Sequence, residues 1–431
     1  MGIEQDWGGR LRLESAELPD GLAHQPSRDF LTTEGLPETA AFLDFHPLGG
    51  PPLEAFGDTA DEGDKEHLFV LGETTYTAHT AHEGDAVLLD GVTGEVFLAG
   101  RRGGALRRDL LATGLPQLVE LLREVDAAAL AAEEPEAIDG QRGPAVVAGV
   151  VDVVRQRMRT VDPALFRDDG APPAHWDTAL LVRSLAWGAL SGAPDGTGSL
   201  AYGITPELVA DLAELSARTD TATTDTAATG TSATDTTATG TAVAGIRRFH
   251  PDELPDVLTH GPTRRLLTEL GLPVGGTVLD VAATGPLRTM AEAHPEDFAS
   301  AGEAEPAAER EYQRDHLALA HWPHDLVIAL DGATGRLELP AWHDPGVPAA
   351  YLNRDLSALL FALWTRERLR AEWRRWEDGR AGAAWAVFDP QALLGHVAEH
   401  VVAAVDPEAF ATPVHSWQLL ADDDHMGGLL Y

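Results

Sequence analysis

Residues 86–100, AVLLDGVTGEVFLAG, and residues 326–340, LVIALDGATGRLELP, decide the fold, because the second stretch repeats the first. In each, a run rich in Val, Ile and Leu leads into Asp-Gly-x-Thr-Gly and then into an alternating run. This pattern predicts a β-hairpin, since glycine supplies the positive φ angle of a tight loop, and Asp and Thr side chains can bond to the turn backbone. We therefore interpret Asp90 and Asp331 as turn residues rather than catalysts.

Further matching blocks surround both stretches and keep the same order. They pair residues 31–45 with 267–281, 109–125 with 350–366, 161–166 (VDPALF) with 405–410 (VDPEAF), and 175–176 with 415–417. A repeat of roughly 185 to 215 residues is far too long for a solenoid, so the pattern indicates a tandem of two globular domains.

A low-complexity stretch rich in Ala, Thr, Asp and Gly separates the copies, at residues 216–245. Almost nothing in it can be buried, so we expect a flexible linker whose ends would lie roughly 30 Å apart as a random coil. The predicted domains are therefore residues 1–215 and residues 246–431.

Each copy is expected to hold a small sheet of largely consecutive strands flanked by helices, which is an α+β fold. In the first copy we expect a strand at 67–72 and helices at 115–125, 144–160 and 205–215. The second copy has helical patterns at 260–270, 352–376 and 390–404 and strand candidates at 274–281, 317–320, 326–330 and 336–339.

The composition is strongly acidic, with a formal net charge of -38. Both copies share this charge, at about -22 up to Leu215 and about -14 from Ile246 onward, so the surface should repel nucleic acid and anionic membranes and favour a basic partner. The alternative is that the charge serves only solubility. We expect a cytoplasmic monomer or weak oligomer, because the sequence has neither a signal-peptide pattern nor an apolar stretch long enough to span a membrane.

Several site classes are excluded or lack a motif. The chain has no cysteine, which excludes disulfides, thiolate zinc sites and zinc deaminase chemistry. There is no phosphate-binding loop motif and no nucleophile elbow, so no cofactor is expected. The arginines and tryptophans of residues 366–376 could stack on nucleic acid, but interleaved glutamates favour helix-surface ion pairs.

Taken together, the blocks resemble the SUKH superfamily of bacterial immunity proteins, and within it the fourth group, which is common in actinobacteria. The resembling segments of the first copy are Gly-Leu-Pro at 35–37, Phe-Leu-Asp-Phe at 42–45, LFVLG at 68–72, the hairpin, and the helix from Leu115. The second copy resembles the family in the Asn-containing entry to its late helix, at Asn353. The first copy has Leu-Ala-Thr-Gly-Leu at 111–115 in that place.

The resemblance implies a non-enzymatic protein that binds and neutralises a toxin domain, often a nuclease or a nucleic-acid deaminase. An acidic surface could meet the basic substrate face of such a toxin. An interaction scaffold of the same fold without a toxin partner remains an alternative. Our candidate contact residues are in the acidic loop of the first copy, which could also be only a solvated loop: Asp61, Glu62, Asp64 and Glu66.

The rival hypothesis is a zinc hydrolase. His396, Glu399 and His400 form H-x-x-E-H on a predicted helix, where two His at i and i+4 can share a zinc ion beside a general base. The corresponding helix of the first copy has no His. This absence favours the interpretation that His396 and His400 are two half-exposed side chains of an amphipathic helix and bind no metal. The third ligand would have to come from Asp422, Asp423, Asp424 or His425, and a weaker cluster comprises His79, His82 and Glu83.

Overall fold

The structure is a computed structural model of the 431-residue chain. It describes residues 9–46, 53, 55, 67–76, 86–102, 105–130, 141–166, 173–191, 199–227, 245–276, 278–298, 311–323, 326–339, 350–379, 387–412, 415–421 and 429–430. Contacts divide the chain into two compact units. Unit 1 comprises Met1–Gln141, Ala145–Trp187 and Trp373–His396, and unit 2 comprises Arg142–Pro144, Gly188–Glu372 and Val397–Tyr431.

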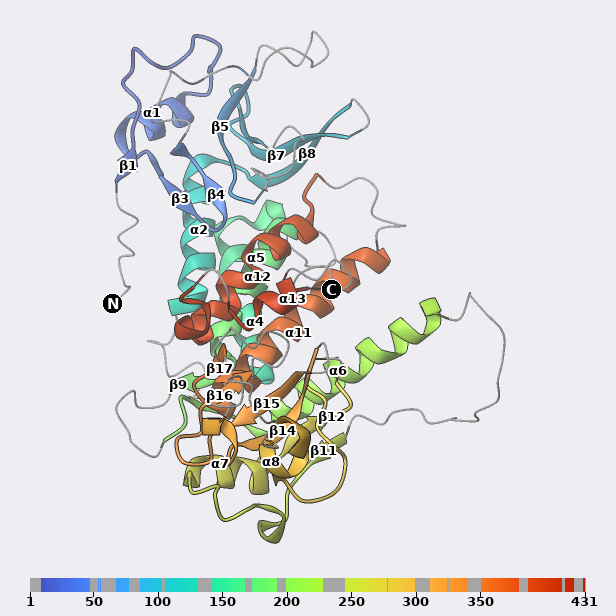
Figure 1. The fold of residues 1–431 in the computed structure, drawn as a ribbon. Helices are drawn as coiled ribbons and strands as arrows, with labels where there is room; N and C mark the ends of the chain where they lie inside the picture. The colour runs from blue at the N-terminus through green and yellow to red at the C-terminus, as the bar shows by residue number, and fades with distance from the viewer. Residues whose placement is uncertain are drawn as a thin grey trace, which may run out of the picture. The chain divides into compact units, whose positions relative to one another are not determined.

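Unit 1 is built on a six-stranded antiparallel sheet with the order β3-β4-β5-β6-β7-β8, so every strand pairs with its neighbour in sequence (Figure 1). The predicted hairpin is the β6–β7 pair, which confirms the central prediction. The strands are β3 Thr39–Ala40, β4 Leu43–Asp44, β5 Leu68–Thr74, β6 Ala86–Asp90, β7 Val96–Arg102 and β8 Ala105–Ala112, and a separate ribbon pairs β1 Arg10–Leu11 with β2 Leu36–Pro37.

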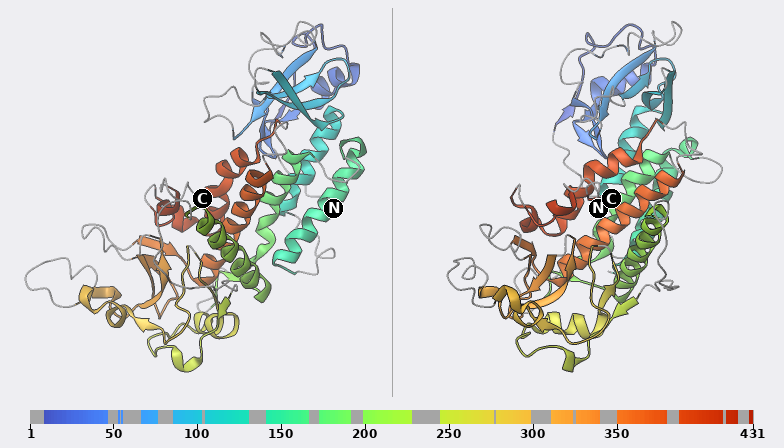
Figure 2. Two further views of the ribbon diagram at one scale, coloured as in Figure 1. Left: turned by 90° about the vertical axis from the view of Figure 1, so that its right-hand side faces the viewer. Right: turned by 45° about the vertical axis from the view of Figure 1, so that its right-hand side comes forward.

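Helices α2 Leu115–Leu130, α4 Pro144–Val161 and α5 Ala174–Ser184 follow the sheet of unit 1. Their apolar faces are buried at helical spacing, as in α2, where Leu115, Leu118, Leu122 and Val125 are fully buried. Arg155 of α4 forms an ion pair of 2.7 Å with Asp177 of α5, and Figure 2 shows the three helices side by side in cyan and green. The helices predicted at 115–125 and 144–160 are therefore confirmed.

Unit 2 repeats this plan with a five-stranded antiparallel sheet in the order β13-β14-β15-β16-β17. The strands are β13 Arg288–Thr289, β14 Leu317–Trp322, β15 Leu326–Leu330, β16 Leu337–Leu339 and β17 Ala350–Asn353. Two short ribbons pair β11 Gly245–Arg247 with β12 Leu272–Val274, and β9 Leu190–Ser191 with β10 Tyr202–Gly203. Of the strand expected at 274–281, Val274 is the last residue of β12 and Asp280 forms an isolated bridge with His321, and the other described residues of this range lie outside strands.

The two sheets share irregularities as well as order. The β5–β6 pair shifts register between Val70 and Gly72, and β14–β15 does so between Ala318 and Ala320. A second shift between Val96 and Phe97 recurs between Leu337 and Glu338. Because a bulge bends a strand at a defined place, the same bulges at matching positions support a duplicated fold.

The remaining helices complete the two units, and the extent of α6 differs from the sequence prediction. They are α1 Gln25–Thr33, α6 Pro206–Ala227, α7 Gly261–Arg265 continued by the π-helix η6 Leu266–Leu270, α8 Met290–Ala293, α9 Pro295–Phe298, α11 Leu356–Gly379, α12 Pro390–Val405 and α13 Gln418–Ala421. The expectation that α6 ends near residue 215 is wrong, because it continues through Ala227 into the predicted linker. The helix begins at the Thr205 cap, and the stretch that extends it holds more Thr than Ala, so its low helix propensity did not predict the extension.

The α+β prediction is confirmed: each unit combines an antiparallel sheet with helices. Residues 228–244 lie outside the described residues, so the boundaries predicted at 215 and 246 stay a prediction. Within the described part of the chain, no helix is both long enough and apolar enough to cross a membrane.

Candidate functional site

The Asp-Gly-x-Thr-Gly motif is a turn in both copies. The Asp90 carboxylate accepts from the backbone N–H of Val92 at 2.8 Å, and Asp331 accepts from Ala333 at 2.8 Å. The last glycine of each motif, Gly94 and Gly335, has a φ of 82° and 84°, the left-handed region that favours glycine. The prediction that these aspartates are turn residues is confirmed.

A histidine packs over each of these turns, which the sequence reading missed. A Cβ added to Gly94 would lie 2.3 Å from the ring of His24, and one added to Gly335 would lie 2.5 Å from His260. Each ring is held by the hydroxyl of the residue three positions on, at 2.8 Å in His24 and 2.7 Å in His260. The two histidines therefore clamp the hairpin turn and have a structural role.

The aspartate of the Val-Asp-Pro motif is an anchor that also occurs in both copies. Asp162 accepts from the backbone N–H of Thr113 at 2.7 Å and from its hydroxyl at 3.0 Å. Both bonds fix the point where β8 leads into α2. Because Thr113 supplies a side-chain donor as well as its backbone N–H, unit 1 makes this contact without an asparagine.

In unit 2 the same anchor uses the asparagine that suggested the resemblance. Asp406 accepts from the backbone N–H of Arg354 at 2.7 Å, from the side chain of Asn353 at 3.2 Å and from the hydroxyl of Tyr351 at 3.1 Å. Burial, followed by the Asp406 charge, raises the pKa of Tyr351. Asn353 is thus a buried structural residue rather than a surface contact.

The predicted acidic contact loop lies outside the described residues: Asp61, Glu62, Asp64 and Glu66. The same holds for the proposed third zinc ligands, Asp422, Asp423, Asp424 and His425, and for the cluster of His79, His82 and Glu83. The toxin-contact residues therefore stay a prediction.

The H-x-x-E-H residues lie on α12 as expected, with His396 half-buried and Glu399 and His400 exposed. Glu399 lies 4.0 Å from Nε2 of His415, the limit of an ion pair. The described residues include no group of three or more His, Asp or Glu side chains placed to hold a metal ion.

The arginine-rich helix α11 differs from the surface helix that its charge pattern predicted. Arg366 is fully buried and forms an ion pair with Glu367, which is also buried, so the prediction of helix-surface pairs is wrong there. Asp211 accepts from the indole N–H of Trp364 at 2.7 Å and from Arg368 at 2.8 Å. Of the predicted stacking residues, Arg366 and Arg368 are therefore engaged in ion pairs within unit 2.

A buried histidine in unit 1 stands in an aromatic setting. His175 on α5 is 1% exposed, and its Nδ1 lies 3.3 Å from the hydroxyl of Tyr76. The rings of Trp176 and Phe388 are 5.0 and 5.4 Å away. Burial lowers the pKa of His175 to about 4, and the Ala41 backbone opposes the shift in part.

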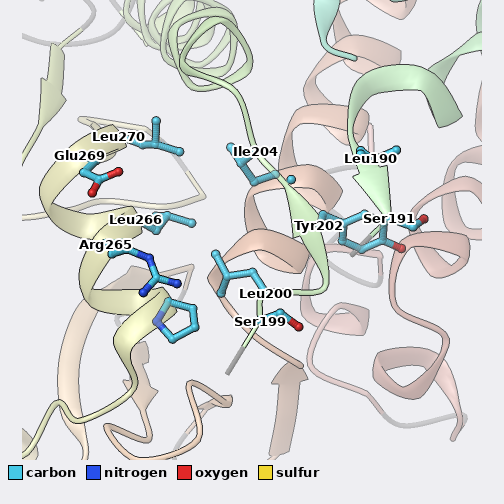
Figure 3. A pocket seen from close by; sticks show the side chains of 12 residues that line it. Leu190, Ser191, Ser199, Leu200, Tyr202, Ile204, Arg265, Leu266, Glu269 and Leu270 are labelled. Atoms are coloured by element: carbon cyan, nitrogen blue, oxygen red, sulfur yellow. The ribbon is translucent and has the colours of Figure 1, made fainter. Parts of the chain in front are cut away.

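Unit 2 holds a pocket of about 470 Å³ between the β9–β10 ribbon and the helix formed by α7 and η6 (Figure 3). Its walls are mainly apolar, and Arg265 and Glu269 add one charge of each sign. The lining residues are Leu190, Ser191, Ser199, Leu200, Tyr202, Gly203, Ile204, Pro262, Arg265, Leu266, Glu269 and Leu270. No sequence motif predicted this site.

Comparison with known families gives one match, which covers both copies. The family model described as SUKH-4 immunity protein matches residues 3–181 and residues 225–423. The chain belongs to the SUKH-4 immunity protein family. No curated protein matches the chain, and no solved structure does either.

The two family matches confirm the tandem duplication inferred from the repeats. Both aspartate anchors, Asp162 and Asp406, lie inside the matched regions. Proteins of an immunity family are generally not enzymes, and their partners are toxins. One wall of the pocket lies outside the matches, because residues 190–204 fall between them, so the pocket is a feature of this chain beyond the SUKH-4 match.

Proposed function

We propose that this SUKH-4 family protein binds and neutralises a toxin domain with a basic substrate face, such as a nuclease or a nucleic-acid deaminase. The family match over both copies carries the immunity part of the proposal. The net charge of -38 supports the choice of a basic partner, because complementary charge speeds encounter and can block the access of a nucleic acid. Binding, and not catalysis, would be the activity.

The acidic loop of the first copy is the proposed contact, through Asp61, Glu62, Asp64 and Glu66. These four acids fall within nine residues of Asp58, in a stretch that has one lysine. A dense negative segment of this kind suits the positively charged groove that a nuclease uses for its substrate. The protein would act in the cytoplasm, where a delivered nuclease meets nucleic acid.

We also propose that residues 1–215 and 246–431 are two immunity domains connected by residues 216–245. Two linked domains would either recognise different toxins or bind one toxin at two places. In the second case, the high effective concentration of the second domain would raise the overall affinity.

The test measures inhibition of purified toxin domains from the same genome by the full-length chain, at low and moderate salt. We expect stoichiometric inhibition of a basic toxin that weakens as salt rises, since exposed charges are screened within about 10 Å at 0.1 M salt. Inhibition of an acidic toxin, or binding unaffected by salt, would contradict the electrostatic part. Failure to bind any toxin would favour a scaffold.

The contact residues need a variant with a matched control. The variant changes Asp61 and Asp64 to Asn and Glu62 and Glu66 to Gln. The control removes four acids elsewhere in the same copy, by changing Glu133, Glu134 and Glu136 to Gln and Asp139 to Asn. We expect the association rate to fall at least about tenfold more in the first variant. Equal losses would mean that only net charge matters.

The zinc hydrolase is tested separately by metal analysis of the purified chain. Stoichiometric zinc that is lost on changing His396 and His400 to Ala would support it against the immunity proposal. The position of the two His on one helix face is the only observation in its favour.

A further inference from the structure

We propose that the pocket of unit 2 binds an amphipathic carboxylate, a small molecule with a hydrocarbon body and one carboxylate. This inference does not rest on the proposed toxin partner. It rests on the apolar walls of the pocket and on the side chain of Arg265, which lines the pocket and is exposed.

The walls supply a preformed apolar cavity. Leu190, Leu200 and Ile204 contribute from the ribbon, and Leu266 and Leu270 from the helix. A volume of about 470 Å³ lies within the range of small-molecule sites, which are mostly apolar with a few placed polar groups. The body of the ligand should therefore be hydrocarbon.

Hydrogen bonds hold the ribbon wall in place. The backbone N–H groups of Ala201 and Tyr202 donate to Asp355 and Ser357 at 2.8 and 2.9 Å. The hydroxyl of Tyr202 donates to the carbonyl of Val405 at 2.6 Å. Because the tyrosine hydroxyl is already bonded, a polar ligand group would have to meet another polar side chain of the pocket.

In the proposed site this side chain is Arg265. Its guanidinium has no ion pair or hydrogen bond to any residue that the structure describes, and its side chain is exposed. In Figure 3 it reaches from the helix toward Leu200, whereas Glu269 lies over its own helix. An exposed arginine beside apolar walls, in a chain of net charge -38, is a receptor for a carboxylate, which it can bind with two parallel hydrogen bonds.

Glu269, four residues on, forms no ion pair with Arg265 in the part of the chain that the structure describes. An α-helix places side chains at i and i+4 on one face, where opposite charges pair. Here the turn Leu266–Leu270 is a π-helix, closed by the bond from the N–H of Gly271 to the carbonyl of Leu266 at 2.9 Å. Local π-helical turns are frequent at functional sites.

The experiment is calorimetric titration of the full chain with decanoate, with decanol and decyltrimethylammonium as neutral and cationic probes of the same chain length. We expect decanoate to bind with a stoichiometry of one and the other two at least about tenfold more weakly, as loss of a charge-assisted hydrogen bond requires. Equal binding of the three probes would overturn the proposal.

Variants identify the site. Arg265→Gln should weaken decanoate binding about tenfold or more, and Leu200→Trp should abolish it by filling the pocket. The matched control is Arg288→Gln, because Arg288 is an exposed arginine of the same unit outside the pocket, and it should bind as the wild type does. Equal weakening in both arginine variants would indicate non-specific attraction and overturn the assignment.

One further variant tests a competing occupant from the chain itself. Asp195 stands in sequence between Ser191 and Ser199, which both line the pocket. If Asp195→Asn binds decanoate about tenfold more tightly than the wild type, a carboxylate of this chain competes for Arg265, and the proposal of an external ligand is overturned. An unchanged affinity supports the external carboxylate.

Discussion

Acidification from pH 7 to pH 5 should destabilise unit 1 through His175. The ring is 1% exposed and is surrounded by Tyr76, Trp176 and Phe388, with the Tyr76 hydroxyl at 3.3 Å as its hydrogen-bond partner. Burial lowers the pKa of His175 to about 4, and no charged side chain contributes to this lowering. Protonation of the folded state is therefore opposed by desolvation alone.

The sign of the effect follows from proton binding in the two states. An unfolded chain binds a proton at His175 near its ordinary pKa of 6.5, whereas the folded chain does so only near 4. The stabilisation is thus fully present above 6.5 and is lost as the pH falls from 6.5 to 4, at about 1.4 kcal/mol per pH unit. From pH 7 to pH 5 the free energy of unfolding should fall by about 2 kcal/mol.

The assay is urea unfolding of the full chain at pH 7 and pH 5, followed by tryptophan fluorescence. Other groups also titrate between pH 5 and pH 7, so the loss of unfolding free energy on acidification is compared between the wild type and His175→Gln. The variant should lose about 2 kcal/mol less than the wild type. His46→Gln is the control, because His46 is an exposed histidine of the same unit, and it should behave as the wild type does. If His175→Gln loses as much stability as the wild type, the assignment to His175 is refuted.

Three further substitutions, measured by thermal unfolding, test the turn glycine Gly94 and the aspartate anchor Asp162 of unit 1. Gly94→Ala should lower the free energy of unfolding by about 1–3 kcal/mol, because its φ is 82° and the new Cβ would meet His24. The control is Gly149→Ala on α4, where the new Cβ has no neighbour within 4 Å, and it should raise the free energy of unfolding by about 0.5–1 kcal/mol. Asp162→Asn should cost about 1–3 kcal/mol, because both Thr113 donors bond the same carboxylate oxygen and an uncharged amide oxygen is a weaker acceptor. An unchanged unfolding midpoint in Gly94→Ala would mean that the turn conformation at Gly94 does not stabilise the fold. The same result in Asp162→Asn would mean that the Asp162 bonds do not stabilise it.

Local chemistry determined which elements could be predicted. The Asp-Gly-x-Thr-Gly hairpin was predictable because its turn bonds lie within three residues, from Asp90 to Val92 and Thr93. The helix boundaries at Leu115 and Pro206 were similarly predictable from periodicity and from the Thr205 cap. The hairpin motif recurs in the second copy at Asp331, where the turn bonds again lie within three residues.

The clamps and the pocket depend on contacts that no local pattern encodes. His24 meets Gly94 across 70 positions, and histidine is not among the preferred helix caps, so nothing marked it in the sequence. The pocket joins the β9–β10 ribbon to the helix of residues 261–270, which lie about 60 positions apart in the sequence. The predicted acidic contacts could not be compared with the structure, since they lie outside the described residues.

The comparison of the two copies separates structural residues from candidates for recognition. The histidine clamps, the aspartate anchors and both strand bulges occur twice, and each occurrence lies at the equivalent place in its copy. Residues whose contacts are internal and repeated are explained by folding alone. Arg265 has no such explanation, because the matching position of the first copy is Asp29, whose carboxylate accepts from Gln25 at 2.7 Å. The two copies therefore share a scaffold and differ in the exposed charge at this position, which makes the pocket of unit 2 one of the first surfaces to test for binding.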